Sequence, residues 1–447
     1  MSSGPADADE VKTLVERVRN LHEGPLVLPD VVALGEPAVP ALEVVLRGPS
    51  GAIHHARCLA ADALAAMPGR AATAALTRAL RDSIARHLDP ISAEAEGVVV
   101  NRIAEHLSGR AGAEATEALL EALITRCYPQ CARALGRLGE PRAIPLLIEC
   151  LYDDAARSAA VEALGRFDGA AVAPLCAALL DPLALNGLEA PSRVDGRTAA
   201  ARLLGRIAVR GTAQTKTESV LHAALHDRQR AIRIEAALAL VRSPAAALEA
   251  ATVLVTALDE ENWARADVLM RVLVSVGELA GPLILPLITE DCGEEAQCTR
   301  RQLRAIELAG RLGSPAALRP LASLSGAAHP ALRLAAIHAL DLIATCDDQS
   351  FARFLEDEEP TVRRRSAAAL LRRHALDPAR AVELLGDSDW GVSRLAVRAL
   401  REAGSSARPA LKGALAGFGA PARGVGARWR LWWRAGWVWM ARPARWC

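Results

Sequence analysis

The stretch ARSAAVEALGRFDGAAVAPLCAALLD, residues 156–181, decides the fold that the sequence predicts. Its first half is rich in Ala and places Arg157 seven residues before Leu164, almost two helical turns, so both side chains lie near one face of a helix. The small Ala side chains between them let a neighbouring helix approach closely. A short turn and a second, apolar helical segment follow. The stretch therefore predicts helices joined by short turns.

The same Arg–Leu spacing recurs along the chain, which indicates an internal repeat. The period is near 30 to 40 residues, and each copy lies in an Ala-rich segment. Another apolar segment that ends at an acidic or small turn comes before each copy, so the predicted unit is helix, turn, helix. The six copies are Arg57 with Leu64, Arg157 with Leu164, Arg197 with Leu204, Arg233 with Leu240, Arg333 with Leu340 and Arg363 with Leu370.

Acidic residues stand at a fixed place before some of these Arg residues. Asp227 precedes Arg233 by six residues, and Asp357 precedes Arg363 by the same interval. A carboxylate at the turn can accept hydrogen bonds from helix amides, and the Arg can reach that turn or the turn of the next unit. We expect a structural ladder, in which losing one partner costs about 3 to 5 kcal/mol if the pair is buried and about 0 to 1 kcal/mol if it is exposed. Its expected members are Arg57, Arg157, Arg197, Arg233, Arg333, Arg363, Asp227 and Asp357.

These motifs resemble the HEAT-repeat superfamily, especially the bacterial form called PBS-lyase HEAT-like repeats. The resemblance is carried by CARALGRLGEPRAIPLLIECLYDD (131–154), by 156–181, by EPTVRRRSAAALL (359–371) and by SDWGVSRLAVRALREAG (388–404). It implies an all-α fold, an α-solenoid that winds as a right-handed superhelix of about eleven helix hairpins. The expected organisation is an N-terminal helix or cap over 1–24, the solenoid over 25–416 and an Arg/Trp-rich tail over 417–447.

Composition narrows the function. The chain has 2 Tyr, 4 Phe and 8 Trp, and six of the Trp fall in the last 19 residues, so the body has few rings on which bases or flat cofactors could stack. Six Arg and no acid lie within 421–447, which leaves the body mildly acidic and a poor match for a phosphate backbone. We expect no cofactor, no nucleic-acid binding by the body, no transmembrane segment and a reduced, cytoplasmic location.

Several groups could in principle hold a metal, and each has an ordinary alternative. Some relatives of the resembled family hydroxylate a modified lysine with two irons held by repeated His–Glu pairs; this chain has one such pair, His22–Glu23, where four are expected. His222 and His226 are four residues apart, beside Asp227, but the sequence shows no third ligand, so ordinary helix surface is favoured over a metal site. His54–His55, Cys127 with Cys131, and Cys292 with Cys298 are interpreted as a surface pair and as small apolar residues, with metal or redox use as the alternative.

The segment 182–198 is predicted to be a long loop that interrupts a repeat. Loops on rigid scaffolds often carry function, so Arg193, Asp195 and Arg197 are a candidate binding site for a peptide or an acidic ligand. The alternative is that the segment is a tolerated insertion without a function. The cluster of Arg363, Arg364 and Arg365 could bind an acidic partner, but the acids just before it favour mutual neutralisation.

The tail changes composition abruptly to Arg, Trp, Gly, Ala and Pro. A frameshifted or misassigned end is one interpretation; a membrane-surface anchor, a nucleic-acid contact and a packed cap are the others. The sequence as a whole predicts a non-enzymatic scaffold that binds a protein partner with its concave helices. A lyase or protein-modifying enzyme is the first alternative, and binding through the tail is the second.

Overall fold

The computed structural model describes residues 8–49, 54–110, 112–180, 190–208, 214–260, 262–293 and 295–417. Within these ranges every regular element is a helix and none is a strand, which confirms the predicted all-α solenoid fold. The chain forms two compact units, Met1–Leu254 (unit 1) and Val255–Cys447 (unit 2). The sequence analysis expects one solenoid over 25–416 and does not anticipate this division. The tail from residue 418 onward lies outside the described residues.

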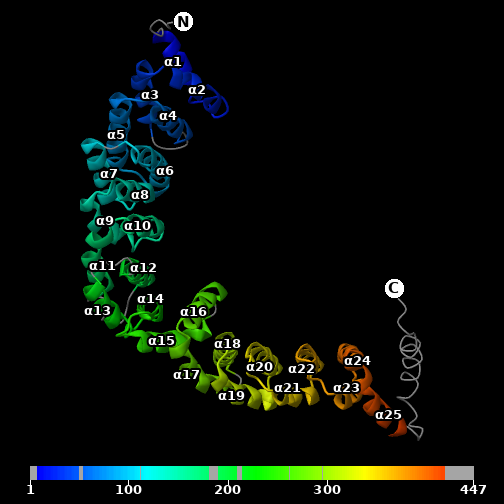
Figure 1. The fold of residues 1–447 in the computed structure, drawn as a ribbon. Helices are drawn as coiled ribbons and strands as arrows, with labels where there is room; N and C mark the ends of the chain where they lie inside the picture. Colours follow the sequence, from blue (N-terminus) through cyan, green and yellow to red (C-terminus); the bar gives the residue numbers. More distant parts are fainter. Residues whose placement is uncertain are drawn as a thin grey trace. The chain divides into compact units, whose positions relative to one another are not determined.

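Unit 1 is built from helices that alternate between two layers (Figure 1). We call the odd-numbered helices from α3 onward A helices and the even-numbered ones B helices; each hairpin is an A helix followed by a B helix. Six hairpins, α3/α4 to α13/α14, follow the first two helices. The helices are α1 (Ala8–Arg17), α2 (Gly24–Ala33), α3 (Val39–Leu46), α4 (His54–Ala66), α5 (Arg70–Ile84), α6 (Pro90–Leu107), α7 (Ala113–Thr125), α8 (Pro129–Leu138), α9 (Ile144–Cys150), α10 (Arg157–Leu164), α11 (Val172–Leu179), α12 (Pro191–Ala208), α13 (Gln214–Ala224), α14 (Arg230–Leu240) and α15 (Ala247–Thr256), which ends just beyond unit 1.

Unit 2 repeats the same alternation in its described part. Four hairpins, α17/α18 to α23/α24, follow α16, and two of the A helices end in short 3-10 turns, η7 (Leu324–Gly326) and η8 (Arg353–Glu356). Along the described chain, α15 and α16 lie between these four hairpins and the six hairpins of unit 1. The total number of helix pairs agrees with the expected number of about eleven. The helices are α16 (Trp263–Ser275), α17 (Gly277–Ile288), α18 (Ala296–Leu312), α19 (Leu318–Ser323), α20 (Pro330–Leu342), α21 (Asp348–Ala352), α22 (Pro360–Arg372), α23 (Pro378–Leu384), α24 (Trp390–Ala403) and α25 (Arg408–Gly417).

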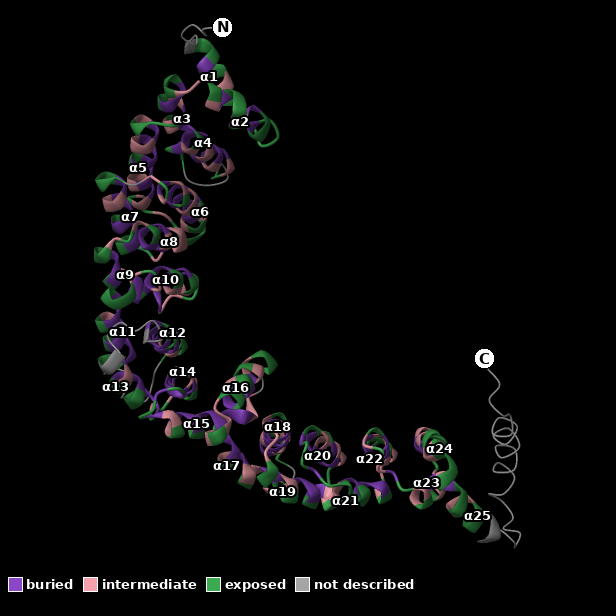
Figure 2. Cartoon of the chain, viewed as in Figure 1, coloured by how far each residue is buried: buried purple, intermediate pink, exposed green. Residues whose placement is uncertain are grey.

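Small residues let neighbouring B helices touch. A Cβ added at Gly136 of α8 would lie 2.6 Å from Ala163 of α10, and one at Gly310 of α18 would lie 2.7 Å from the Cα of Ala339 in α20. These distances leave no room for a side chain, which explains why the B helices are rich in Ala and Gly. The Leu and Ala side chains between the layers are buried and form the core of each unit (Figure 2).

A helix that spans a membrane needs both sufficient length and high hydropathy, and the described helices can be judged on both. No single one of them meets both criteria. The pair α16 and α17 meets them only when its two helices are taken together, and these are bent by 119° to one another.

Candidate functional site

The recurring Arg residues lie on B helices and connect consecutive hairpins. Arg333 of α20 donates from Nη1 to the carbonyls of Ala327 and Ala328, at 2.8 and 3.1 Å. These two residues follow the A helix of its own hairpin. Its other nitrogens reach the turn of the next hairpin: Nε to Oδ2 of Asp357 at 2.7 Å and Nη2 to Oδ1 at 2.9 Å. The side chains are 4% and 3% exposed, so this pair is buried. Arg333 therefore satisfies carbonyls left open at a helix end and joins two hairpins at once.

Arg363 of α22 repeats this arrangement one hairpin later. Its Nη1 donates to the carbonyl of Asp357 at 2.7 Å, while Nε and Nη2 donate to the carboxylate of Asp387, both at 2.7 Å. Burial alone would raise the pKa of Asp387, but the hydrogen bonds from Arg363 and from the amide of Asp389 bring that pKa below its ordinary value. The hydrogen bond to Asp387 raises the pKa of Arg363. The carboxylate and the guanidinium are thus held in their charged forms.

Arg57 and Arg197 occupy the same place in unit 1. Arg57 donates from Nε to the carbonyl of Leu46 at 2.8 Å and binds the carboxylate of Glu96 at 2.5 and 2.6 Å. Arg57 and Glu96 are 2% and 3% exposed, so α4 and α6 share a buried ion pair. Arg197 donates from Nε to the carbonyl of Leu179 at 3.0 Å and also binds Asp227.

Arg157 and Arg233 show the same contact with their own hairpin. Arg157 donates to the carbonyl of Leu151 at 2.9 Å, and Arg233 donates to the carbonyls of Asp227 and Arg228 at 2.8 and 2.9 Å. Every Arg of the expected ladder therefore contacts the end of the preceding A helix, whereas Asp227 and Asp357 are bound by the Arg of the previous hairpin.

Two hairpins keep the helix-end contact without Arg. In α18, Gln302 is 3% exposed and donates to the carbonyls of Ile288 and Glu290 at 2.9 and 3.0 Å. In α24, the hydroxyl of Ser393 donates to the carbonyl of Asp387 at 3.2 Å. The Arg–Leu spacing could not reveal Gln302, because Gln replaces the Arg that defines the spacing. It could not reveal Glu96, because that residue is the acceptor of Arg57 and comes from the next hairpin.

The candidate binding residues Arg193, Asp195 and Arg197 do not lie on a loop. The prediction of a loop over 182–198 is wrong from residue 191 onward, because α12 begins at Pro191; residues 181–189 lie outside the described part. The Arg193 guanidinium lies 5.4 Å from the centre of the Tyr152 ring, and Asp195 lies 3.6 Å from Arg157. Arg197 is 5% exposed and belongs to the ladder. Each of the three side chains therefore contacts a different neighbouring residue of the solenoid: Tyr152, Arg157 and Asp227.

Ion pairs also join B helices on the solvent side of unit 1. Nε of Arg102 in α6 lies 2.6 Å from Asp62 of α4, a carboxylate that His106 also contacts at 2.6 Å. Burial would raise the pKa of Asp62, but hydrogen bonds from His106 and Arg102 lower it. These contacts fix α4 against α6.

Besides the contact between Arg157 of α10 and Asp195 of α12, two further ion pairs join consecutive B helices of unit 1. Arg133 of α8 lies 3.0 Å from Glu162 of α10, and Arg202 of α12 lies 2.6 Å from Glu235 of α14. The hydrogen bond to Glu235 raises the pKa of Arg202. Together with the Asp62–Arg102 pair, these contacts join α4 to α6, α8 to α10 and α12 to α14. The outer side chains of each joined pair of helices therefore keep a fixed spacing.

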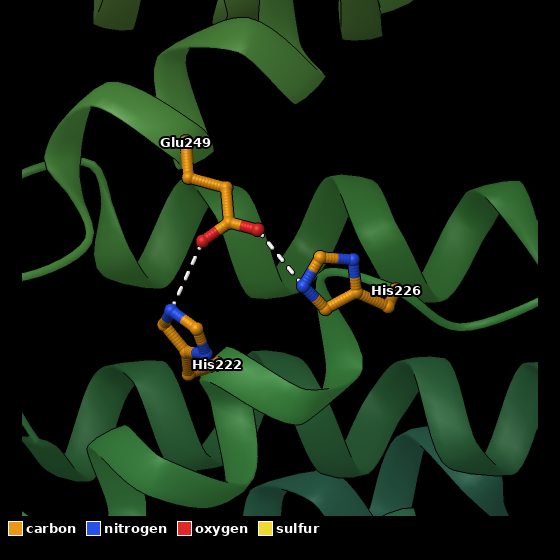
Figure 3. A group of neighbouring side chains, drawn as sticks. All are labelled: His222, His226 and Glu249. Atoms are coloured by element: carbon orange, nitrogen blue, oxygen red, sulfur yellow. Dashed lines mark ion pairs between the residues drawn. The ribbon is translucent and has the colours of Figure 1, made fainter.

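His222 and His226 face one carboxylate, Glu249 (Figure 3). Nε2 of His222 lies 2.9 Å from Oε2, and Nε2 of His226 lies 2.8 Å from Oε1. Glu249 lies in the first turn of α15, the A helix that follows α13. This third group is not visible from the spacing of the two histidines, because only the stacking of consecutive A helices brings Glu249 to them.

Among the described residues, the other Cys and His pairs that the sequence offers as possible metal ligands are not joined by a third ligand as His222 and His226 are, or are joined to each other. Cys292 and Cys298 form a disulfide, so their interpretation as small apolar residues is wrong. A hydrogen bond with Cys150 lowers the pKa of the Cys127 thiol, and burial raises that of Cys131. His22–Glu23 lies in the turn between α1 and α2, and His54–His55 opens α4.

The basic cluster on α22 is shared among several neighbours. Arg363 binds Asp387, and Arg365 lies 3.0 Å from the ring of His338. Glu356, one of the acids before the cluster, binds Arg380 at 2.6 Å. Arg363 and Glu356 are thus paired with residues of the next hairpin and not with each other.

Comparison with known proteins gives one family match. Residues 117–184, a range that begins within α7 and extends past the end of α11, match the family described as HEAT repeats. Among curated proteins, none matches the chain at a significant level. The PBS-lyase subtype is a finer assignment than this match provides.

Solved structures resemble the chain at low identity. An engineered protein is 17% identical over 88% of this chain and 98% of its own, with a TM-score of 0.26. Human deoxyhypusine hydroxylase in complex with glycerol is 18% identical over 72% of this chain and 98% of its own, at 0.23. Importin beta is 16% identical over 88% of this chain and 55% of its own, at 0.36. Likeness at this level implies no shared activity or partner.

Proposed function

We propose that this chain, whose residues 117–184 match HEAT repeats, is a non-enzymatic scaffold that binds a protein partner along its B helices. One observation carries the proposal: ion pairs between consecutive B helices of unit 1 hold their outer side chains at fixed spacing. A surface that is already ordered loses little conformational entropy when a partner binds. Affinity would be spread over several hairpins. We further propose the PBS-lyase HEAT-like subtype and a cytoplasmic location, in which the Cys292–Cys298 disulfide would be an exception among otherwise free thiols.

Exposed apolar side chains on B helices support protein contact. Val98 of α6 is 49% exposed, and Trp390, the first residue of α24, is 61% exposed with Arg394 5.3 Å from its ring centre. Tryptophan and arginine are enriched among the residues that dominate binding energy at protein interfaces. Trp390 is therefore our candidate anchor in unit 2.

A photo-crosslinking amino acid placed at single positions in the full chain tests the proposal. The position Val98 on α6 probes the B helices, and Val44 on α3, 65% exposed, is the matched control on the A helices. We expect one reproducible protein adduct in host cells from Val98 and none from Val44. Adducts from Val44 alone, or none from either position together with turnover of a small molecule, would contradict the scaffold.

The two alternatives give different results in related experiments. A lyase or protein-modifying enzyme would turn over a candidate substrate, and the purified chain would carry a bound chromophore or metal on which the turnover depends. Binding through residues 417–447 would be lost when the chain is truncated at Leu415, whereas the scaffold predicts that the truncated chain still gives the Val98 adduct.

A further inference from the structure

We propose that His222, His226 and Glu249 form a binding site for a divalent transition metal of the zinc class. The two imidazole Nε2 atoms lie 2.9 and 2.8 Å from the two oxygens of one carboxylate (Figure 3). The three ligand atoms all lie within 4.8 Å of one another. Two imidazoles and one carboxylate are a ligand set that zinc uses in proteins.

Local structure explains why the histidines converge. His222 lies in the last turn of α13, and His226 follows one turn later, where its amide donates to the carbonyl of Ala223 at 3.2 Å. Residues four apart in a helix share a face. The rings are 6.1 Å apart between centroids and inclined by 66°, so both edges face the same volume.

Glu249 comes from the next A helix, so the site joins two hairpins. Its place in the first turn of α15 suits a carboxylate, because the amino end of a helix carries partial positive charge. The carboxylate contacts both rings. A metal at about 2.0 to 2.2 Å from each ligand atom would replace those contacts.

The surroundings leave room for further ligands. The side chains of His222, His226 and Glu249 are 48%, 68% and 37% exposed, so water can complete the coordination. Asp227, next to His226, is not available as a fourth ligand, because its carboxylate binds Arg197 and the amide of Gln229. The proposed site therefore has three protein ligands and an open side.

A second possible ligand group is less suited to a metal. Glu290, Cys292 and Cys298 also lie close together, but the two sulfur atoms are joined as a disulfide and cannot act as thiolates. The histidine site has no such restriction.

The test is titration of the full chain with Zn²⁺ by calorimetry and with Co²⁺ by visible absorption, comparing wild type with His226→Gln and Glu249→Gln. His106→Gln is the matched control, because His106 also contacts a carboxylate, Asp62, at 2.6 Å but has no second histidine. We expect one equivalent in the wild type and in the control, and binding weaker by about tenfold or more in the other two variants. The Co²⁺ spectrum should lack thiolate charge-transfer absorption.

Thermal unfolding supplies a second measurement. Because the metal would bind the folded state and link α13 to α15, Zn²⁺ should raise the Tm of wild type and of His106→Gln more than that of Glu249→Gln. The circular dichroism of each variant without metal shows whether it is folded. Equal affinity in Glu249→Gln and wild type would mean that the histidine pair binds alone and would overturn the proposal, as would the absence of one-to-one binding in the wild type.

Discussion

Arg333 and Asp357 are 24 residues apart in the sequence and share two hydrogen bonds of 2.7 and 2.9 Å, at positions that are 4% and 3% exposed. The pair links α20 to the turn before α22. A buried ion pair is costly to break, because the partner left behind stays charged and desolvated.

Asp357→Ala should therefore destabilise unit 2 by about 3 to 5 kcal/mol, because it leaves the Arg333 guanidinium buried without its carboxylate. Glu356→Gln, in the same turn but 77% exposed, should cost about 0 to 1 kcal/mol. Hydrogen exchange of peptides from α20 and α22 in the full chain measures both. The double variant Arg333→Met with Asp357→Leu should recover much of the loss; equal costs for Asp357→Ala and Glu356→Gln would show that the pair contributes little.

Gly310→Ala should destabilise the contact between α18 and α20 by about 1 to 3 kcal/mol, because its Cβ would lie 2.7 Å from the Cα of Ala339 and the helices would have to separate. Gly281→Ala is the matched control: Gly281 lies in α17, and a Cβ there meets nothing within 4 Å. The control should be neutral or stabilise by up to about 1 kcal/mol through helix propensity. Urea unfolding followed by circular dichroism compares the two; an equal loss would contradict the close approach.

Acid should weaken the junction between α22 and α24. Hydrogen bonds from Arg363 bring the pKa of Asp387 below its ordinary value despite burial. The folded-state pKa thus lies below the unfolded one, so the stabilisation is present at neutral pH and is lost as pH falls through the folded-state pKa. Asp387→Asn should lower the free energy of unfolding more at pH 7 than at pH 3, measured in urea. Glu383→Gln, whose side chain is 61% exposed, should cost less than about 1 kcal/mol at both pH values.

The disulfide between Cys292 and Cys298 should stabilise the segment between α17 and α18. The two residues are six apart, and closing so short a loop in the unfolded chain contributes about 2 kcal/mol. A reductant should therefore lower the Tm of wild type and leave the variant Cys292→Ser with Cys298→Ser unchanged. Alkylation of the unfolded chain checks the bond itself: reduction should expose two additional thiols, and finding none would contradict it.

The sequence predicted the helices and the recurring Arg because both follow from local spacing. Arg333 and Leu340 fall on one helical face whatever the neighbouring hairpin does. The partner is different: Asp357 is six residues before Arg363, yet Arg333 binds it, and only the stacking of hairpins brings those two together. Spacing within one hairpin could not show this choice.

Three functional contributions were missed for the same physical reason. Gln302 takes the place of a ladder Arg, so the Arg–Leu spacing does not mark it. Glu96 reaches Arg57 only through the next hairpin, and Glu249 reaches the histidines only through the next A helix. The expected loop over 182–198 was wrong from Pro191 because Pro and Gly were interpreted as loop signals, although Pro is well accommodated in the first turn of a helix.

The ladder gives unit 2 an evolutionary freedom. Arg333 and Arg363 are 30 residues apart, as are Asp357 and Asp387, and each Arg uses the Asp supplied by the following copy. Removing one copy in register would bring Arg333 to Asp387 with the same chemistry, and duplicating one would create a new pair without any further substitution. Genes for such a chain can therefore lengthen or shorten by whole modules through unequal recombination while these Arg–Asp junctions stay compatible.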